Sequence, residues 1–136
     1  MLAVDTNVVV RFLVNDDARQ HERAVALFRA HEVWLSKTVL LESEWVLRSA
    51  FGFEAKEIAQ AFEHLLRLPS VSCENRHVLS AAIDALRHGM DFADALHLQA
   101  ARHADCDEGF STFDRKFIAR VTRRWPDVRV SQPPSV

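Results

Sequence analysis

The residues of this chain best suited to chemistry are aspartates that stand where helices begin. Asp91 and Asp94 lie three positions apart, so both carboxylates fall on one face of the helix that the following residues predict. Asp114 opens another predicted helix, and Asp5 follows the apolar stretch Leu2–Val4. Carboxylates that gather without cysteine, and without histidine at ligand spacing, favour a hard cation such as Mg²⁺ or Mn²⁺.

Helix capping is the alternative explanation for each of these aspartates. Asp5, Asp91 and Asp114 would each accept hydrogen bonds from free backbone N–H groups at a helix start, where the helix dipole also stabilises a carboxylate. For any one of them alone, capping is the better explanation. It does not explain why such helix entrances would share one edge of a sheet. The cluster therefore predicts a metal site that prepares water for attack on a phosphodiester.

A fourth acid is expected from the helix predicted for residues 39–51. Glu42 and Glu44 are two positions apart, a rotation of about 200°, so only one of them faces a given site. Glu44 stands four before Arg48, as in a surface ion pair. Glu42 lies near the direction of Trp45 and other apolar residues, where a carboxylate needs a partner to offset its desolvation. We therefore expect Glu42 in the site.

Short apolar strands alternate with helical segments along the whole chain. The predicted strands are Leu2–Val4, Val33–Leu35, Ser70–Cys73, a segment around Phe110, and Val128–Val130. Because helices separate these strands, we expect an α/β fold with a mostly parallel sheet and helices on both faces. Ligands of such sheets bind beyond the carboxyl ends of the strands. Asp5 and Asp114 would face each other there if their strands are neighbours.

Length and composition predict one domain over residues 1–131 with a flexible tail at 132–136. The net charge of −2 argues against holding nucleic acid by overall charge alone. Residues 115–129 nevertheless carry six basic side chains and one acid, which suits a phosphate backbone or simply a solvated helix face. Two isolated cysteines indicate a reducing, cytosolic setting, and no apolar run is long enough to cross a membrane.

Four segments resemble the motifs of PIN domains and, more narrowly, those of the VapC toxins of bacterial toxin–antitoxin pairs. They are Val4–Asn7, Thr38–Arg48, Asp91–Leu98 and Thr112–Phe117. Their order and spacing match over essentially the whole chain, which makes the resemblance specific. It implies a three-layer α/β/α fold and a Mg²⁺- or Mn²⁺-dependent endoribonuclease. It also implies a homodimer that a cognate VapB antitoxin keeps silent.

The resemblance assigns an acidic quartet by motif position: Asp5, Glu42, Asp94 and Asp114. The three aspartates of this set would hold the ion. Asp91 would be an accessory acid, Asn7 the polar residue beside the first aspartate, and Thr112 the hydroxyl that orients the last one. Within the basic C-terminal segment, Arg115 and Lys116 are the expected RNA contacts.

Other functions remain open from the sequence alone. The strongest is a catalytically silent PIN-like module that binds RNA or protein and whose acids are only helix caps. An aspartyl-phosphate phosphatase would need a second aspartate two positions after Asp5, where Asn7 stands instead. His97 lies three after Asp94 and could touch substrate, although a core or surface histidine is the better explanation.

Overall fold

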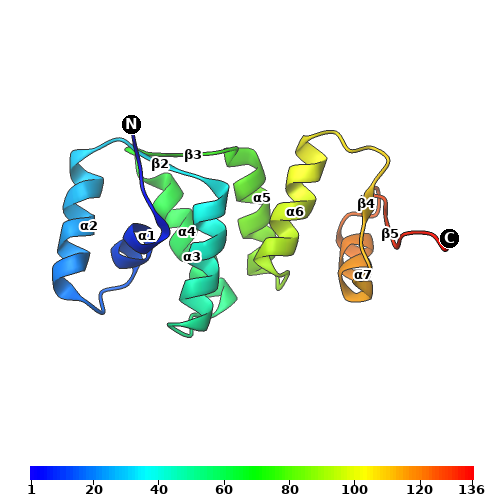
Figure 1. Ribbon diagram of the computed structural model, residues 1–136, viewed down its shortest axis with the longest axis horizontal. Coiled ribbons are helices and arrows are strands. Elements are labelled where there is room, and N and C mark those ends of the chain that lie inside the picture. The colour runs from blue at the N-terminus through cyan, green and yellow to red at the C-terminus, as the bar shows by residue number, and fades with distance from the viewer.

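The computed structural model describes residues 1–136, the whole chain, as seven helices and five short strands (Figure 1). The strands are β1 (Leu2–Ala3), β2 (Val33–Leu35), β3 (Val71–Cys73), β4 (Phe110–Ser111) and β5 (Val130–Ser131). The helices are α1 (Thr6–Leu13), α2 (Ala18–Ala30), α3 (Lys37–Ser49), α4 (Ala55–Arg67), α5 (Arg76–Arg87), α6 (Phe92–His103) and α7 (Arg115–Arg124). None of these helices has the length and apolar character needed to cross a membrane.

Every strand pairing is parallel, but the strands fall into two separate sheets. The first has the order β1-β2-β3, and the second pairs β4 with β5. In Figure 1, β4, α7 and β5 gather beyond α6, at the opposite end of the molecule from α2. The helix-rich α/β fold with parallel strands is confirmed and is consistent with three α/β/α layers. The expectation that the strands before Asp5 and Asp114 share one sheet is wrong.

The core is made mainly by the helices, which supply most of its buried apolar side chains. Helix α4 buries Ile58, Phe62 and Leu65 completely or nearly so, a spacing of three and four residues that puts them on one face. Phe62 meets Phe92 at the start of α6 with ring centroids 5.7 Å apart. Each such large apolar side chain contributes about 1.5–3 kcal/mol when it leaves water. This packing fixes where α6 begins, and with it the position of the predicted site.

Capping side chains set the starts of most helices. Asp17 caps α2 by accepting from the Gln20 N–H at 3.1 Å. Ser36 caps α3 in the same way. Asn7 is also a residue type that often caps helices, but helix α1 already begins at Thr6, and Asp5 caps it.

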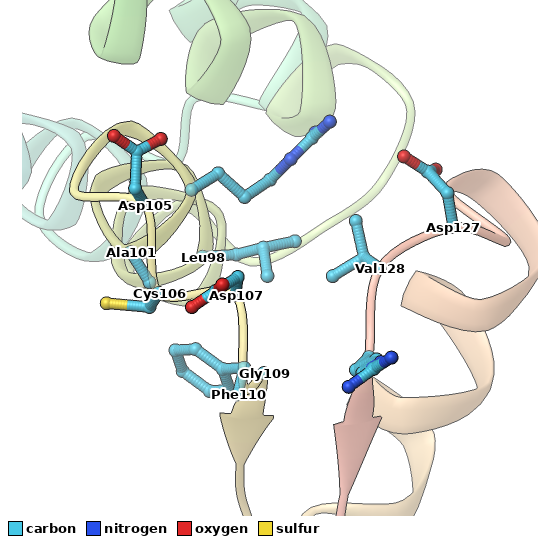
Figure 2. Close-up of a pocket in the computed structure, with 11 residues that line it drawn as sticks. Leu98, Ala101, Asp105, Cys106, Asp107, Gly109, Phe110, Asp127 and Val128 are labelled. Carbon is cyan, nitrogen blue, oxygen red and sulfur yellow. The ribbon is translucent and has the colours of Figure 1, made fainter.

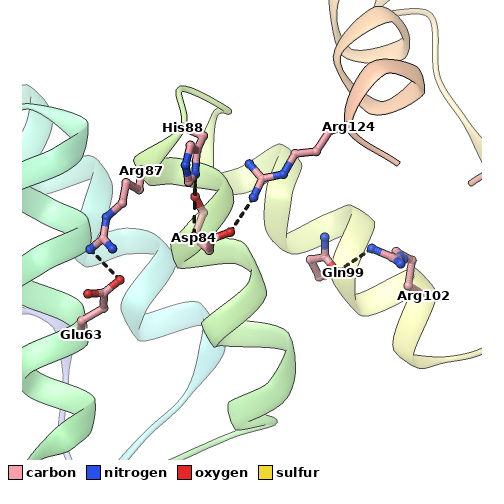
Figure 3. A network of polar contacts seen from close by, with 7 residues as sticks. All are labelled: Glu63, Asp84, Arg87, His88, Gln99, Arg102 and Arg124. Atoms are coloured by element: carbon pink, nitrogen blue, oxygen red, sulfur yellow. Dashed lines mark hydrogen bonds and ion pairs between the residues drawn. The ribbon is translucent and has the colours of Figure 1, made fainter. Parts of the chain in front are cut away.

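Helix α7 ties the C-terminal strands to the rest of the chain. Its Phe117 and Val121 are buried in the main core. The Arg120 guanidinium donates to the Gly89 carbonyl oxygen, and Arg124 contacts the Asp84 carboxylate at 2.5 Å (Figure 3). Between α6 and the β4–β5 pair lies an open cavity of about 480 Å³, shown in Figure 2. None of the predicted site residues lines this cavity.

Candidate metal centre

Two helix entrances, those of α6 and α7, supply the acids of the candidate site. Asp91 caps α6, and its Oδ2 accepts a hydrogen bond from the Asp94 N–H at 3.1 Å. Asp114 caps α7, and its Oδ1 accepts from the Phe117 N–H at 3.0 Å. The Thr112 hydroxyl oxygen in turn accepts from the Asp114 N–H at 3.1 Å. Capping therefore engages one oxygen of Asp91 and one of Asp114, as the alternative explanation predicts, while Asp94 caps nothing.

The side chains of Asp91, Asp94 and Asp114 line one cavity of about 360 Å³, which we call the carboxylate cleft. Burial raises the pKa of Asp94, and the charges of Asp91 and Asp114 raise it further. His97 and Arg120 act in the opposite direction but do not cancel the rise. No hydrogen bond to the Asp94 carboxylate lowers its pKa. The ionised form of Asp94 therefore has no hydrogen-bond partner in the cleft, and a bound cation would stabilise it.

Glu44 also lines the carboxylate cleft, although the sequence argument put it on the surface. Only 3% of Glu44 is exposed, and its carboxylate oxygens lie 3.2 and 3.3 Å from the Arg48 Nε. Glu42 is exposed and does not line the cleft, so the expectation that it lies on the buried face is wrong. The buried row of α3 runs through Leu40, Ser43, Glu44 and Leu47. The signal for Glu44 was thus its spacing from two leucines, three and four positions away.

The first aspartate lies outside the cleft. Asp5 is exposed at the start of α1, where its Oδ1 accepts from the Thr6 N–H at 2.8 Å. Asn7 lines a different cavity, between α1 and α2. In this conformation no three acids, histidines or cysteines lie close enough to hold one ion together. The structure thus brings together Asp91, Asp94 and Asp114 but not Asp5 or Glu42.

Basic side chains stand beside the acids. Lys116 and Arg120 of α7 line the cleft, and Arg48 lines it from α3. Arg115, the other predicted RNA contact, is exposed at the first position of α7 and is not part of the lining. The arrangement of acids with flanking cations suits a phosphodiester, because the cations can contact the phosphate while the acids face an ion.

Comparison with protein families gives a match over nearly the whole chain. A family model described as PIN domain matches residues 2–123. The chain belongs to the PIN-domain family. Comparisons with curated proteins and with solved structures gave no match. PIN domains are generally metal-dependent nucleases, so the match supports a nuclease-type function for this chain.

The aspartates of the carboxylate cleft have the ligand chemistry that a hard divalent cation requires. All three aspartates offer oxygen ligands, as Mg²⁺ and Mn²⁺ prefer, and no cysteine lines the cleft. Mg²⁺ commonly keeps several waters and needs only one or two carboxylates from the protein, together with substrate phosphate. Burial first, and then the charges of Asp91 and Asp114, raise the pKa of Asp94, and a bound cation would favour its ionised form. The aspartates of the cleft therefore offer the kind of ligand that such an ion takes.

Proposed function

We propose that this PIN domain is a Mg²⁺- or Mn²⁺-dependent endoribonuclease that hydrolyses RNA phosphodiester bonds in the carboxylate cleft. The observation that carries the proposal is the Asp94 carboxylate, partly buried between the charges of Asp91 and Asp114 with no hydrogen bond to stabilise it. An acid in that position is costly unless it meets a cation. Family membership supports the nuclease chemistry.

Each residue of the cleft has a role in this proposal. Asp94 and Asp114 would hold the ion, whose chemistry is to prepare water and to neutralise charge on the phosphate. Asp91 fixes the start of α6 and so places Asp94. The Thr112 hydroxyl oxygen accepts from the backbone N–H of Asp114 and so places Asp114. Lys116 would contact the phosphate.

Asp5 and Glu42 keep their proposed roles on the resemblance alone, because this conformation leaves both outside the cleft. The structure suggests Glu44 as a further candidate, since it is buried at the cleft wall against Arg48. The variants Asp5→Asn, Glu42→Gln and Glu44→Gln rank these acids in one cleavage assay. Substitution of an acid that serves the reaction should reduce the cleavage rate without reducing the stability of the protein.

We further propose a VapC-type toxin that forms a homodimer and is silenced by a VapB-type antitoxin. The motif resemblance supports this narrower role. Trp45 on α3 is 59% exposed, and an aromatic side chain in that position suits contact with a partner chain. The alternative remains a silent module that binds RNA or protein and whose aspartates only cap helices, because both Asp91 and Asp114 do cap helices.

Cleavage of total bacterial RNA by the purified protein tests the nuclease directly. We expect discrete fragments with Mg²⁺ and none with EDTA. Asp94→Asn should lower the rate by at least about 100-fold, because even indirect partners of metal ligands are worth 10–100-fold. The matched control is Asp107→Asn, which removes the same charge from an exposed position outside the cleft. Equal cleavage by both variants would refute the site, and no cleavage by the wild type would favour the silent module.

A further inference from the structure

A second cavity lies next to the carboxylate cleft and has a different character. Its volume is about 580 Å³, and no apolar residue lines it. Its walls are Lys56, Gln60, Glu63, His64 and Arg67 of α4 with Arg87 and His88 from the end of α5. We call this cavity the basic basin. Pockets for small organic ligands are mostly apolar, so the lining of the basin suits a charged and hydrated ligand instead.

The basic basin and the carboxylate cleft share a border. At the start of α4, Ala55 lines the cleft and the next residue, Lys56, lines the basin. At the end of α5 the same alternation occurs, because Leu86 and Gly89 line the cleft while the two residues between them line the basin. The Gly89 carbonyl at this border accepts from Arg120 of the cleft. The two cavities thus draw their walls from adjoining residues at the start of α4 and the end of α5, a proximity that would let one extended ligand contact both.

The basin carries a net positive charge that the protein does not neutralise. Figure 3 shows its one acid, Glu63, contacting Arg87, with Oε1 and Nη2 2.6 Å apart. Lys56 and Arg67 make no ion pair within the chain. Two cations thus remain free for an anionic ligand. Both are exposed, so reaching such a ligand costs them little desolvation.

The free cations belong to a row along α4. Lys56, Gln60, His64 and Arg67 recur every three or four residues and therefore lie on one side of the helix. The opposite side carries the buried Ile58. From the first to the last member the row spans about 16 Å at the helical rise per residue. A row of this length suits an extended polyanion better than a single phosphate.

We propose that the basic basin binds the phosphodiester backbone of a single-stranded RNA whose scissile bond lies in the carboxylate cleft. This inference rests on the nuclease function proposed above, because it takes the ligand to be the RNA that is cut there. The lining favours RNA over an acidic protein segment. Protein partners gain most of their affinity from apolar or aromatic anchors in pockets, and the basin offers no apolar wall to receive one.

RNA binding as a function of salt tests this inference. The probe is a fluorescently labelled oligouridylate of about 12 nucleotides, within the usual site size for single strands. Binding is measured by anisotropy in EDTA, which keeps the proposed nuclease idle. The double variant Lys56→Ala/Arg67→Ala removes both free cations. The matched control is Arg19→Ala/Arg29→Ala, which removes two exposed cations of α2 that line neither cavity.

We expect the plot of log affinity against log salt concentration to become shallower by about 1.4 for the basin variant, since each cation on a single strand contributes about 0.7. That change corresponds to about 25-fold weaker binding at 0.1 M salt. The control should keep the wild-type slope. Lys56→Gln/Arg67→Gln should behave like the alanine pair, and thermal melts verify that all variants fold. A wild-type slope in both basin variants, or no binding by the wild type, overturns the proposal.

Failure of the basin and failure of the nuclease give different results. Unchanged salt slopes together with normal metal-dependent cleavage would remove only the basin. A reduced slope without any cleavage would refute the nuclease and leave the basin as a binding surface. An oligoglutamate peptide serves as the second probe. If it binds the basin as tightly as the RNA does, the assignment to RNA is overturned in favour of an acidic protein segment.

Discussion

Substituting Asp94 by asparagine gives the sharpest test of the charge balance in the carboxylate cleft. Asp94→Asn keeps the shape of the side chain and removes its charge. Burial first, and then the charges of Asp91 and Asp114, raise the pKa of Asp94, so the folded chain holds the ionised form at a cost. In EDTA at neutral pH, we therefore expect Asp94→Asn to unfold at a higher temperature than the wild type.

The pH dependence of this difference follows from the direction of the pKa shift. The ordinary pKa of the group is 3.8, and the folded value lies above it. Between these two values the folded state binds more protons than the unfolded state, so the contribution of Asp94 to stability falls as pH rises. The gap in melting temperature between Asp94→Asn and the wild type should thus be larger above the folded pKa than below 3.8.

Addition of Mg²⁺ should reverse the order of the two proteins. An ion at ten times its dissociation constant stabilises the folded state by about 1.4 kcal/mol. For a chain of 136 residues the entropy of unfolding is about 0.29 kcal/mol/K, so the wild-type melting temperature should rise by about 5 °C. Asp94→Asn should gain little, and the control Asp107→Asn should gain as much as the wild type.

Calorimetric melts in EDTA and in a MgCl₂ series provide the measurement. The reasoning is refuted if Asp94→Asn melts at or below the wild type in EDTA, because the carboxylate would then have a stabilising partner that the structure does not show. It is also refuted if Mg²⁺ raises both melting temperatures equally. That result would place the ion at some other group.

Two further substitutions test the structure around the cleft. Gly109→Ala would put a Cβ atom 2.7 Å from the Arg129 carbonyl oxygen at a φ of +122°, so we expect a loss of about 1–3 kcal/mol in urea unfolding. A stability equal to the wild type would show that β4 and β5 do not approach as described. Arg48→Ala leaves Glu44 buried without its cation, and because the Arg48 side chain is 50% exposed we expect a loss of only about 1–2 kcal/mol. Adding Glu44→Gln should restore the stability, and a double variant as unstable as Arg48→Ala would contradict this account.

Local features of the fold were accessible from the sequence because they depend on neighbouring residues. The strand Val33–Leu35 is confirmed with the predicted bounds. The caps at Asp91 and Asp114 are also confirmed. Each is set by a side chain that reaches a backbone N–H group one turn away, a contact that sequence spacing alone determines. Such contacts can be predicted without knowing how the helices pack.

The choice between the two glutamates of α3 required knowledge of packing. The prediction aligned Glu42 with Trp45, on the assumption that a tryptophan points inward. Trp45 is 59% exposed, and the buried side of α3 instead includes Ser43 and Glu44. Ser43 can be buried because its hydroxyl donates to the Val39 carbonyl oxygen at 2.7 Å. The polar residues Ser43 and Glu44 interrupt the apolar spacing of α3, so the sequence does not reveal which side of this helix is buried.

The meeting of Asp94 with Asp114 has a physical basis that the strand argument missed. The sequence reasoning expected parallel strands to bring the aspartates together, yet β1 and β4 have two residues each and do not pair. The two acids instead stand within three residues of Phe92 and Phe117, which are 0% and 5% exposed. Burying each ring contributes about 1.5–3 kcal/mol, whereas a pairing of two residues offers only a few hydrogen bonds of about 1 kcal/mol each. Aromatic anchors at the first turns of α6 and α7 therefore position the acids of the cleft. The first turn of α1, which follows Asp5, contains no aromatic residue, and Asp5 lies outside the cleft.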